Sequence, residues 1–277
     1  MRMYSAAESF LLEFHRVRPG ATALAFGDLE VTMDGRRYAS SYEALATTAL
    51  QAAPPGAVVL DVGCGNGHLL QLVAAFRDDA RLVGIDMSRD ELAAAPAALR
   101  SRASLVHARA QAMPLAPVSV DVAVSHLALM LMDDVDAVIA GIARVLKGGG
   151  TLAAVVGHAP VPSPAFDAYL ELLVPHLQAA SPPRLGDRRM RSEEGICELL
   201  SQQFDRVRMH ELRIERLLSV QALWAVFEDM YDLYHLQGAQ REAILASWLR
   251  TVQPIADAGG GLVSHSQRLR LFAAQRR

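Results

Sequence analysis

Three glycines at alternating positions separate an apolar run from a helical pattern, and this spacing is typical of a loop that wraps a ligand. The stretch from Val58 to Leu70 reads Val-Val-Leu-Asp-Val-Gly-Cys-Gly-Asn-Gly-His-Leu-Leu. Glycine lets the backbone take left-handed angles and approach a ligand without Cβ atoms in the way. The helix that follows presents unpaired N–H groups at its start. The sequence therefore predicts a strand, a ligand-binding turn and a helix, with a nucleotide-like molecule as the ligand.

The same spacing narrows the kind of ligand. The dinucleotide fingerprint Gly-x-Gly-x-x-Gly requires glycine at position 68, where this chain has His68. The order Asp-x-Gly-x-Gly-x-Gly, which starts at Asp61, resembles the first motif of the class I (Rossmann-like) S-adenosylmethionine-dependent methyltransferases. The resemblance covers about residues 56–156, and its motifs come in the family's order. It implies S-adenosyl-L-methionine as the cofactor and S-adenosyl-L-homocysteine as the product.

Strand and helix patterns alternate around this loop, which predicts an α/β fold with a doubly wound, mostly parallel sheet. Further strands are predicted at 81–86, 104–107, 120–125, 150–156 and 206–214, and a last, antiparallel strand within 261–274. Helices are predicted near 5–15 and from about Ser41, and at 69–76, 90–101 (interrupted at Pro96), 135–146, 165–178 and 192–203. In the resembling family the sheet has seven strands.

We expect three regions along the chain. Residues 1–50 form an N-terminal helical cap, with a loop containing three glycines between its two helices. Residues 51–157 form the cofactor-binding core. Residues 158–277 complete the fold and carry helical insertions at about 160–183 and 219–256, the second of which lies before the last strand. In the resembling family an insertion at that point commonly covers the substrate, so both are predicted to act as a substrate lid.

The resemblance assigns roles to residues of the glycine loop and of the second strand. Asp61 would lie under the bend and bond the loop or the cofactor's ammonium group. Asp86 would accept hydrogen bonds from both ribose hydroxyls, because one carboxylate offers two acceptor oxygens; an N-cap or turn role is the alternative. Met87 would lie against the adenine. The residues that would wrap the methionine part and the ribose are Gly63, Cys64, Gly65, Asn66 and Gly67.

Residues 108–115 resemble the family's adenine-contacting segment, with one departure. The position that usually holds an acid carries Arg109, which has donors only and cannot accept from the adenine amino group. Ala110 and Gln111 are the predicted adenine contacts. The side chain of Arg109 is open to three interpretations, which are solvent exposure, stacking on a ring and a salt bridge.

Ser125 and His126 end the fourth strand, where family members place residues beside the sulfonium and methyl group. A neutral imidazole accepts a proton from a hydroxyl or an acidic carbon near physiological pH, so His126 is the candidate base. The alternative is that it only lines the cofactor pocket. The Asp/Asn-Pro-Pro-aromatic motif of enzymes that methylate nucleobase or amide nitrogen is absent here, which argues against DNA-base methylation.

Aromatic residues of the cap and of the 219–256 insertion are the candidate acceptor contacts, although spacing on one helix face is also typical of core packing. These candidates are Tyr4, Phe14, Tyr38, Trp224, Phe227 and Tyr231. An arginine cluster offers either a binding site for an acceptor carboxylate or phosphate, or a solvated face. Its members are Arg184, Arg188, Arg189 and Arg191.

Composition limits the partners. The 27 Lys and Arg against 30 Asp and Glu give a formal charge of −3, so no global positive field recruits nucleic acid or an anionic membrane. Two cysteines offer no disulfide framework and no zinc-ligand pattern, and no metal is predicted. No apolar run reaches the roughly 18 residues of a membrane helix, and no signal peptide is recognised. A cytoplasmic protein is expected, while the sequence leaves its oligomeric state open.

These observations predict a methyltransferase that acts on a small-molecule acceptor, at oxygen first and at carbon second, as in specialised (secondary) metabolism. Two other functions remain open. An NAD(P)-dependent oxidoreductase is disfavoured by His68 and by the lack of an obvious Tyr-x-x-x-Lys pair. A non-catalytic protein that binds S-adenosylmethionine is supported only by Arg109.

Overall fold

The computed structural model describes residues 4–277, and the chain divides into two compact units. The first unit comprises Met1–Ala159, Leu185–Leu212 and Leu269–Arg277. The second comprises Pro160–Arg184 and Arg213–Arg268. The second unit contains both predicted insertions, and their role as a lid stays a prediction.

The N-terminal part of the first unit begins with helix α1 (Ala6–Val17), which starts at a capping box made by Ser5 and Glu8. The predicted helix at Ser41 is confirmed as α3 (Ser41–Leu50), with Ser40 as its N-cap. The segment between them, expected to be a loop, instead contains helix α2 (Ala21–Phe26) and a short hairpin of β1 (Val31–Met33) and β2 (Arg36–Tyr38). The three residues of each strand gave too short a pattern for a prediction.

The alternation of strands and helices predicted for the core is confirmed. Its strands are β3 (Val58–Val62), β4 (Arg81–Asp86), β5 (Ala103–His107), β6 (Val120–His126) and β7 (Leu146–Gly157). Its helices are α4 (His68–Phe76), α5 (Arg89–Ala94), α6 (Ala97–Arg100), η1 (Ala110–Ala112), η2 (Leu129–Leu131) and α7 (Val135–Val145). As expected, Pro96 separates α5 from α6, because proline has no N–H for the helix ladder. Later in the chain come η3 (Arg188–Arg191), α9 (Glu193–Leu200), β8 (Phe204–Leu218) and β9 (Val263–Arg276).

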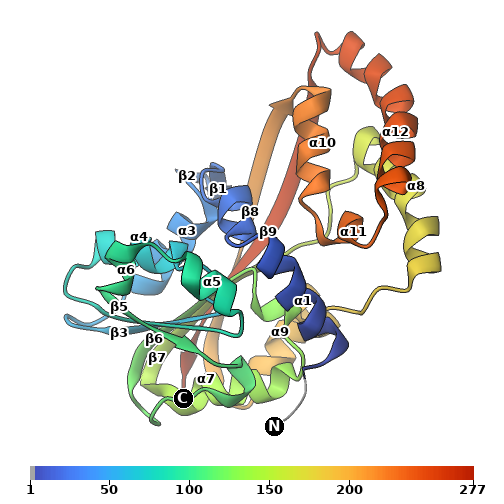
Figure 1. Cartoon of the computed structure of the whole chain (residues 1–277). Helices are drawn as coiled ribbons and strands as arrows, with labels where there is room; N and C mark the ends of the chain where they lie inside the picture. Colours follow the sequence, from blue (N-terminus) through green and yellow to red (C-terminus); the bar gives the residue numbers. More distant parts are fainter. Residues whose placement is uncertain (1–3) are drawn as a thin grey trace. The chain divides into compact units, whose positions relative to one another are not determined.

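The sheet has the order β2-β1-β8-β9-β7-β6-β3-β4-β5 (Figure 1). Strand β3 pairs in parallel with both β4 and β6, and β7 pairs in parallel with β6. Strand β9 is antiparallel to β7, as predicted for the last strand. The sheet therefore has the predicted doubly wound, mostly parallel class I architecture, with nine strands rather than seven because the β1–β2 hairpin adds two at one edge.

Helices cover both faces of the central strands. Leu60, Val62 and Ala154 share one hydrophobic cluster with residues of α7 and α9, while the alternate side chains of each strand point to the other face. On that other face α3 packs against β6, β7 and α4. The carboxyl ends of β3 and β6 lie side by side between these layers, at the point where the strand order reverses. Open α/β sheets bind their ligands at this switch point.

The second unit contains four helices, α8 (Pro164–Ala180), α10 (Val220–Glu228), α11 (Tyr231–Tyr234) and α12 (Gly238–Ala258), which lie together in Figure 1. They share a cluster that includes Tyr169, Phe227 and Trp248, all fully buried. The Trp248 indole donates to the carbonyl of Ala165 at 2.8 Å, which ties α12 to α8.

Candidate active site

The glycine loop between β3 and α4 takes the conformation that its sequence predicts. Gly63 and Gly67 have φ of +76° and +80°, a region that L side chains rarely adopt. A Cβ at Gly63 would lie 2.5 Å from the Cβ of Ala128, which follows β6. The N–H groups of Gly63 and Cys64 both donate to the carbonyl of Ile85, at 2.8 and 3.0 Å. The loop is thereby bound to β4 and packed against the segment after β6. The thiol of Cys64 is buried, and this burial raises its pKa, which argues against a reactive thiolate.

Asp86, at the end of β4, is bound to this loop through its carboxylate. Oδ2 accepts from the N–H of Gly65 and Oδ1 from the N–H of Ser88, both at 2.8 Å. Burial raises the pKa of Asp86, and the two N–H donors act in the opposite direction. Each carboxylate oxygen has about two lone-pair sites, so each can still accept from a ligand hydroxyl. The carbonyl of Asp86 also accepts from the N–H of Ala108 at 3.0 Å, which links it to the predicted adenine segment.

Asp61 is the most unusual group of the site. It is 2 % exposed, and its Oδ1 has no hydrogen-bond partner within residues 4–277. Burial raises its pKa well above the usual range, and the negative charge of Asp86 adds to this effect. A buried carboxylate without a partner costs free energy, which a bound cation would offset.

His126 ends β6 and is held from two sides by α3. Its Nε2 is hydrogen-bonded to Ser41 Oγ at 2.8 Å, and its ring stacks on Tyr42 with the centroids 3.5 Å apart. Burial, together with the charge of His68, lowers the pKa of His126 to about 3, so the ring is neutral near physiological pH. Its Nδ1 is buried and has no hydrogen-bond partner in the described part of the chain. The preceding Ser125 donates from Oγ to the carbonyl of Val62 at 2.7 Å, which joins β6 to β3.

The predicted adenine segment forms η1, and its side chains are already engaged. Ala110 is buried, and the amide of Gln111 donates to the carbonyl of Asp133 at 2.6 Å. Of the three interpretations of Arg109, the structure has the salt bridge. Arg109 donates to Glu8 Oε1 of helix α1 from Nε at 2.9 Å and from Nη2 at 2.5 Å.

The predicted acceptor contacts fall in both units. In the first unit, Tyr4 is 41 % exposed, whereas Phe14 and Tyr38 are buried. In the second unit, Trp224 and Phe227 belong to the aromatic cluster of α8, α10 and α12, and Tyr231 begins α11. Phe227 lies 4.4 Å from the ring of Tyr169 and is fully buried, which is the geometry of core packing. Their contact with an acceptor stays a prediction.

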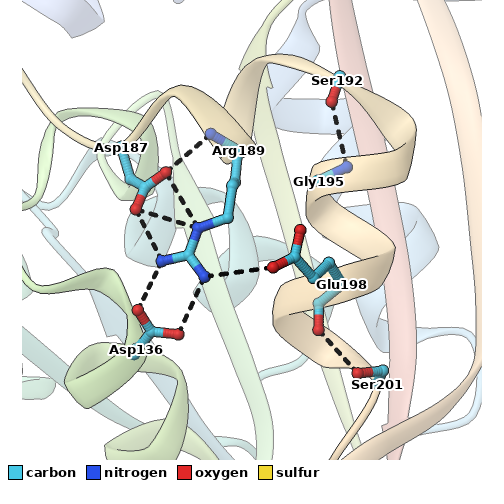
Figure 2. Close-up of polar contacts among 7 residues, drawn as sticks. All are labelled: Asp136, Asp187, Arg189, Ser192, Gly195, Glu198 and Ser201. Carbon is cyan, nitrogen blue, oxygen red and sulfur yellow. Dashed lines mark hydrogen bonds and ion pairs between the residues drawn. The ribbon is translucent and has the colours of Figure 1, made fainter.

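The arginine cluster includes one residue with a clear structural role. The guanidinium of Arg189 pairs with Asp187 at 2.8 Å and with Asp136 of α7 at 2.5 Å, and Glu198 lies 3.9 Å away (Figure 2). The two aspartates raise the pKa of Arg189. This network ties η3 to α7, so Arg189 has little capacity left for an acceptor anion.

Sequence reasoning missed the contacts that three residues make in the site. Ser41 and Tyr42 contact His126 from a segment 85 residues earlier in the chain, a distance that no local pattern reveals. Glu91 is 3 % exposed and bonds the N-terminal part of the chain, yet the spacing of Ser88 and Glu91 suggests only a helix cap. No cluster of three or more metal-ligating side chains occurs within the described residues, and none of the described helices is long and apolar enough to cross a membrane.

The fold, the loop geometry and a sequence comparison agree on the class of protein. Residues 60–154 match the family model described as a methyltransferase domain. These residues form a class I S-adenosylmethionine-dependent methyltransferase domain, of the family that the glycine-loop motif resembles, and S-adenosylmethionine is the cofactor of this family.

Among curated proteins, the chain is similar to a malonyl-[acyl-carrier protein] O-methyltransferase of Methylococcus capsulatus. The two are 36% identical over 106 residues, which is 36% of this chain and 37% of that protein. The match thus spans little more than a third of the relative.

Two solved structures extend the comparison of folds. Phosphoethanolamine N-methyltransferase 2 of Haemonchus contortus, in complex with S-adenosyl-L-methionine, has a TM-score of 0.58 and 18% identity over 99% of this chain and 60% of its own. The [4+2]-cyclase SpnF has a TM-score of 0.56 and 18% identity over 99% of this chain and 98% of its own. Proteins named for different reactions therefore share this fold.

Proposed function

We propose that this protein transfers a methyl group from S-adenosylmethionine to a small-molecule acceptor, at a hydroxyl oxygen first and at a carbon next to a carbonyl second. The observation that carries the proposal is the buried carboxylate of Asp61, whose Oδ1 lacks a partner among the described residues. Asp86 lies close enough to raise its pKa. Two carboxylates in this arrangement suit a ligand that carries both a cationic group, for Asp61, and a diol, for Asp86.

Each half of this pair has its own role. Asp61 would bind the ammonium group of the cofactor, and Asp86 would accept from both ribose hydroxyls while it holds Gly65 in place. The loop residues Gly63 to Gly67 would wrap the methionine part, and Met87 and Ala110 would flank the adenine. A nicotinamide dinucleotide fits less well, because its anionic pyrophosphate would lie on the loop beside two buried carboxylates.

When bound, the cofactor supplies an electrophilic methyl group on a sulfonium that is already a good leaving group. The protein then contributes mainly alignment and exclusion of water. His126, fixed by Ser41 and Tyr42 at the switch point, would line the reacting end of the pocket as a neutral ring. Because burial lowers its pKa, His126 is a weak base. It would therefore accept a hydrogen bond from the hydroxyl of the acceptor more readily than it would take the proton.

The choice of oxygen is supported by the curated relative, which is an O-methyltransferase and matches 36% of this chain. A small apolar acceptor suits the neutral wall made by Tyr42 and His126. A non-catalytic binding protein remains the alternative.

Calorimetric titration with S-adenosylmethionine, S-adenosylhomocysteine and NADH tests the cofactor. We expect binding of the two adenosyl ligands and none of NADH. Transfer of labelled methyl from S-adenosylmethionine to a panel of phenols, carboxylic acids and malonyl thioesters then tests the reaction. Binding of NADH alone would overturn the proposal, and adenosyl binding without transfer to any acceptor would favour the non-catalytic alternative.

A further inference from the structure

Glu91 binds the N-terminal part of the chain and lies beside the glycine loop. This carboxylate, on α5, is almost completely buried. The N–H of Gly20, in the turn between α1 and α2, donates to both of its oxygens at 3.0 Å. His15 Nδ1, in the last turn of α1, lies 2.7 Å from Oε1. Two groups of the N-terminal part of the chain therefore meet at one buried carboxylate of α5.

The same turn lies directly against the predicted cofactor loop. A Cβ at Gly20 would lie 2.7 Å from Asn66 Nδ2, and a Cβ at Gly65 would lie 3.4 Å from Glu91 Oε2. Gly20 has φ of +76°, so both the space and the backbone angle favour glycine at this position. The carboxylate of Glu91 therefore has the loop on one side and the turn after α1 on the other.

A second contact holds the opposite end of α1. Arg109, which directly precedes η1, pairs with Glu8 in the first turn of this helix. The Glu8 side chain is only 4% exposed, and its other oxygen accepts from the N–H of Ser5. Ser5 Oγ also donates to Asp133, next to the carbonyl that Gln111 bonds. Helix α1 is thus fixed at its start to the predicted adenine segment, and at its end to Glu91, which lies beside the glycine loop.

We propose that Arg109 and Glu91 are positioning residues for the cofactor, which hold α1 and the following turn as an added wall of its site and must release them before the cofactor exchanges. The inference rests on the proposed cofactor site. It also gives a role to Arg109, which stands where the family usually has an acid.

Burial is the reason that these contacts hold the helix. When one partner of a buried charge pair is removed, the other is left uncompensated, whereas an exposed pair is solvated by water. Helix α1 also carries such an exposed pair, Glu13 with Arg16 at 2.6 Å, with side chains 51% and 58% exposed. Glu13→Gln is therefore a matched control on the same helix.

The test measures the dissociation rate of S-adenosylhomocysteine from the 277-residue chain by stopped-flow displacement. We expect Glu91→Gln and Arg109→Gln each to raise this rate by about tenfold or more, and Glu13→Gln to leave it unchanged. Glu8→Gln keeps the helix-capping acceptor and removes the charge, so it should match Arg109→Gln. The double variant Glu8→Gln/Arg109→Gln should dissociate no faster than either single variant, because both remove one interaction.

Hydrogen exchange of amides 6–20 gives a readout that needs no catalysis. In the wild type, S-adenosylhomocysteine should slow this exchange, and the protection should be weaker in Glu91→Gln and Arg109→Gln. If the two variants fold, and bind and release the ligand at the wild-type rate, the positioning role is overturned and the proposed function is not affected. If Arg109→Gln acts and Glu8→Gln does not, Arg109 contacts the ligand itself and the positioning role fails. A wild-type protein that binds neither adenosyl ligand would overturn the proposed function as well.

Discussion

The two units differ in the kind of side chain that they bury. At the switch point of the first unit, Asp61 and His126 are buried with one polar atom each that lacks a partner among the described residues. In the cluster of the second unit, aromatic rings pack on one another, with Phe227 between Tyr169, Trp248 and His265. The hydroxyl of Tyr169 and Nε1 of Trp224 also lack a partner among the described residues, but they are neutral, and a buried carboxylate without a partner costs more free energy, which a ligand would offset. Function should therefore respond to charge in the first unit, and stability to volume in the second.

The largest effect is expected in the second unit. Phe227→Ala should lower the free energy of unfolding by about 3–5 kcal/mol, because it leaves a cavity among fully buried rings. Both tryptophans of the chain, Trp224 and Trp248, belong to this unit, so tryptophan fluorescence during urea unfolding reports on it. Cofactor affinity should be unchanged. A change in affinity as large as the loss of stability would contradict the separation of roles, and Phe227→Leu is the milder control.

Asp86→Ala is expected to change a free energy by less than Phe227→Ala does, but the change falls on cofactor binding rather than on unfolding. This change removes the predicted ribose acceptor and the carboxylate that holds Gly65 and Ser88, so cofactor binding should weaken by about 2–4 kcal/mol. Calorimetric titration measures the loss. Asp90→Ala, at an exposed acid four residues further on, is the control and should bind like the wild type. Equal affinities for Asp86→Ala and the wild type would remove Asp86 from the site.

The sequence predicted the strand-loop-helix unit and the acid at the end of β4, because these features are local. The helical spacing, the strand-ending Asp86 and the loop glycines all lie within a few residues of the groups they position. The partners of the same site were not predictable in this way. Arg109 meets Glu8 and His126 meets Ser41 only after the sheet has assembled, at separations of 101 and 85 residues.

The short hairpin and the aromatic residues of the second unit also show what a local sequence pattern does not predict. Three-residue strands such as β1 and β2 have too few positions to show a period of two. The prediction that Trp224, Phe227 and Tyr231 share one helix face was wrong for Tyr231, because α10 ends at Glu228 and Tyr231 begins α11. For Trp224 and Phe227, periodicity does not distinguish a core from a binding surface. That distinction depends on which rings pack against it, such as Tyr169 of α8.

The unpartnered carboxylate of Asp61 predicts a dependence of cofactor affinity on pH. Its pKa is raised in the free protein, so below that raised pKa the ammonium group must displace a proton to pair with it. Affinity should therefore rise with pH, by up to about tenfold per pH unit, between the ordinary and the raised pKa, and then level off. The free protein should show the opposite trend, because a carboxyl whose folded pKa is raised loses stability as pH rises through the same window. Asp61→Asn should abolish both trends in titrations at several pH values; persistence of the affinity trend would assign it to another group.

The smallest effect is predicted for His126, whose folded pKa of about 3 lies below the ordinary value of a histidine. A histidine with a lowered folded pKa stabilises the fold above its unfolded pKa and loses that contribution as pH falls from about 6.5 towards 3. Between about pH 7 and 8 the imidazole should not titrate, so its Cε1–H resonance should stay fixed while those of exposed histidines move. His126→Gln identifies the resonance by its loss. A titration midpoint near neutrality would show that the ring is solvated, like a histidine at the surface. His126 would then be able to take the proton from the hydroxyl of the acceptor, and the contrast between the two units would not extend to this residue.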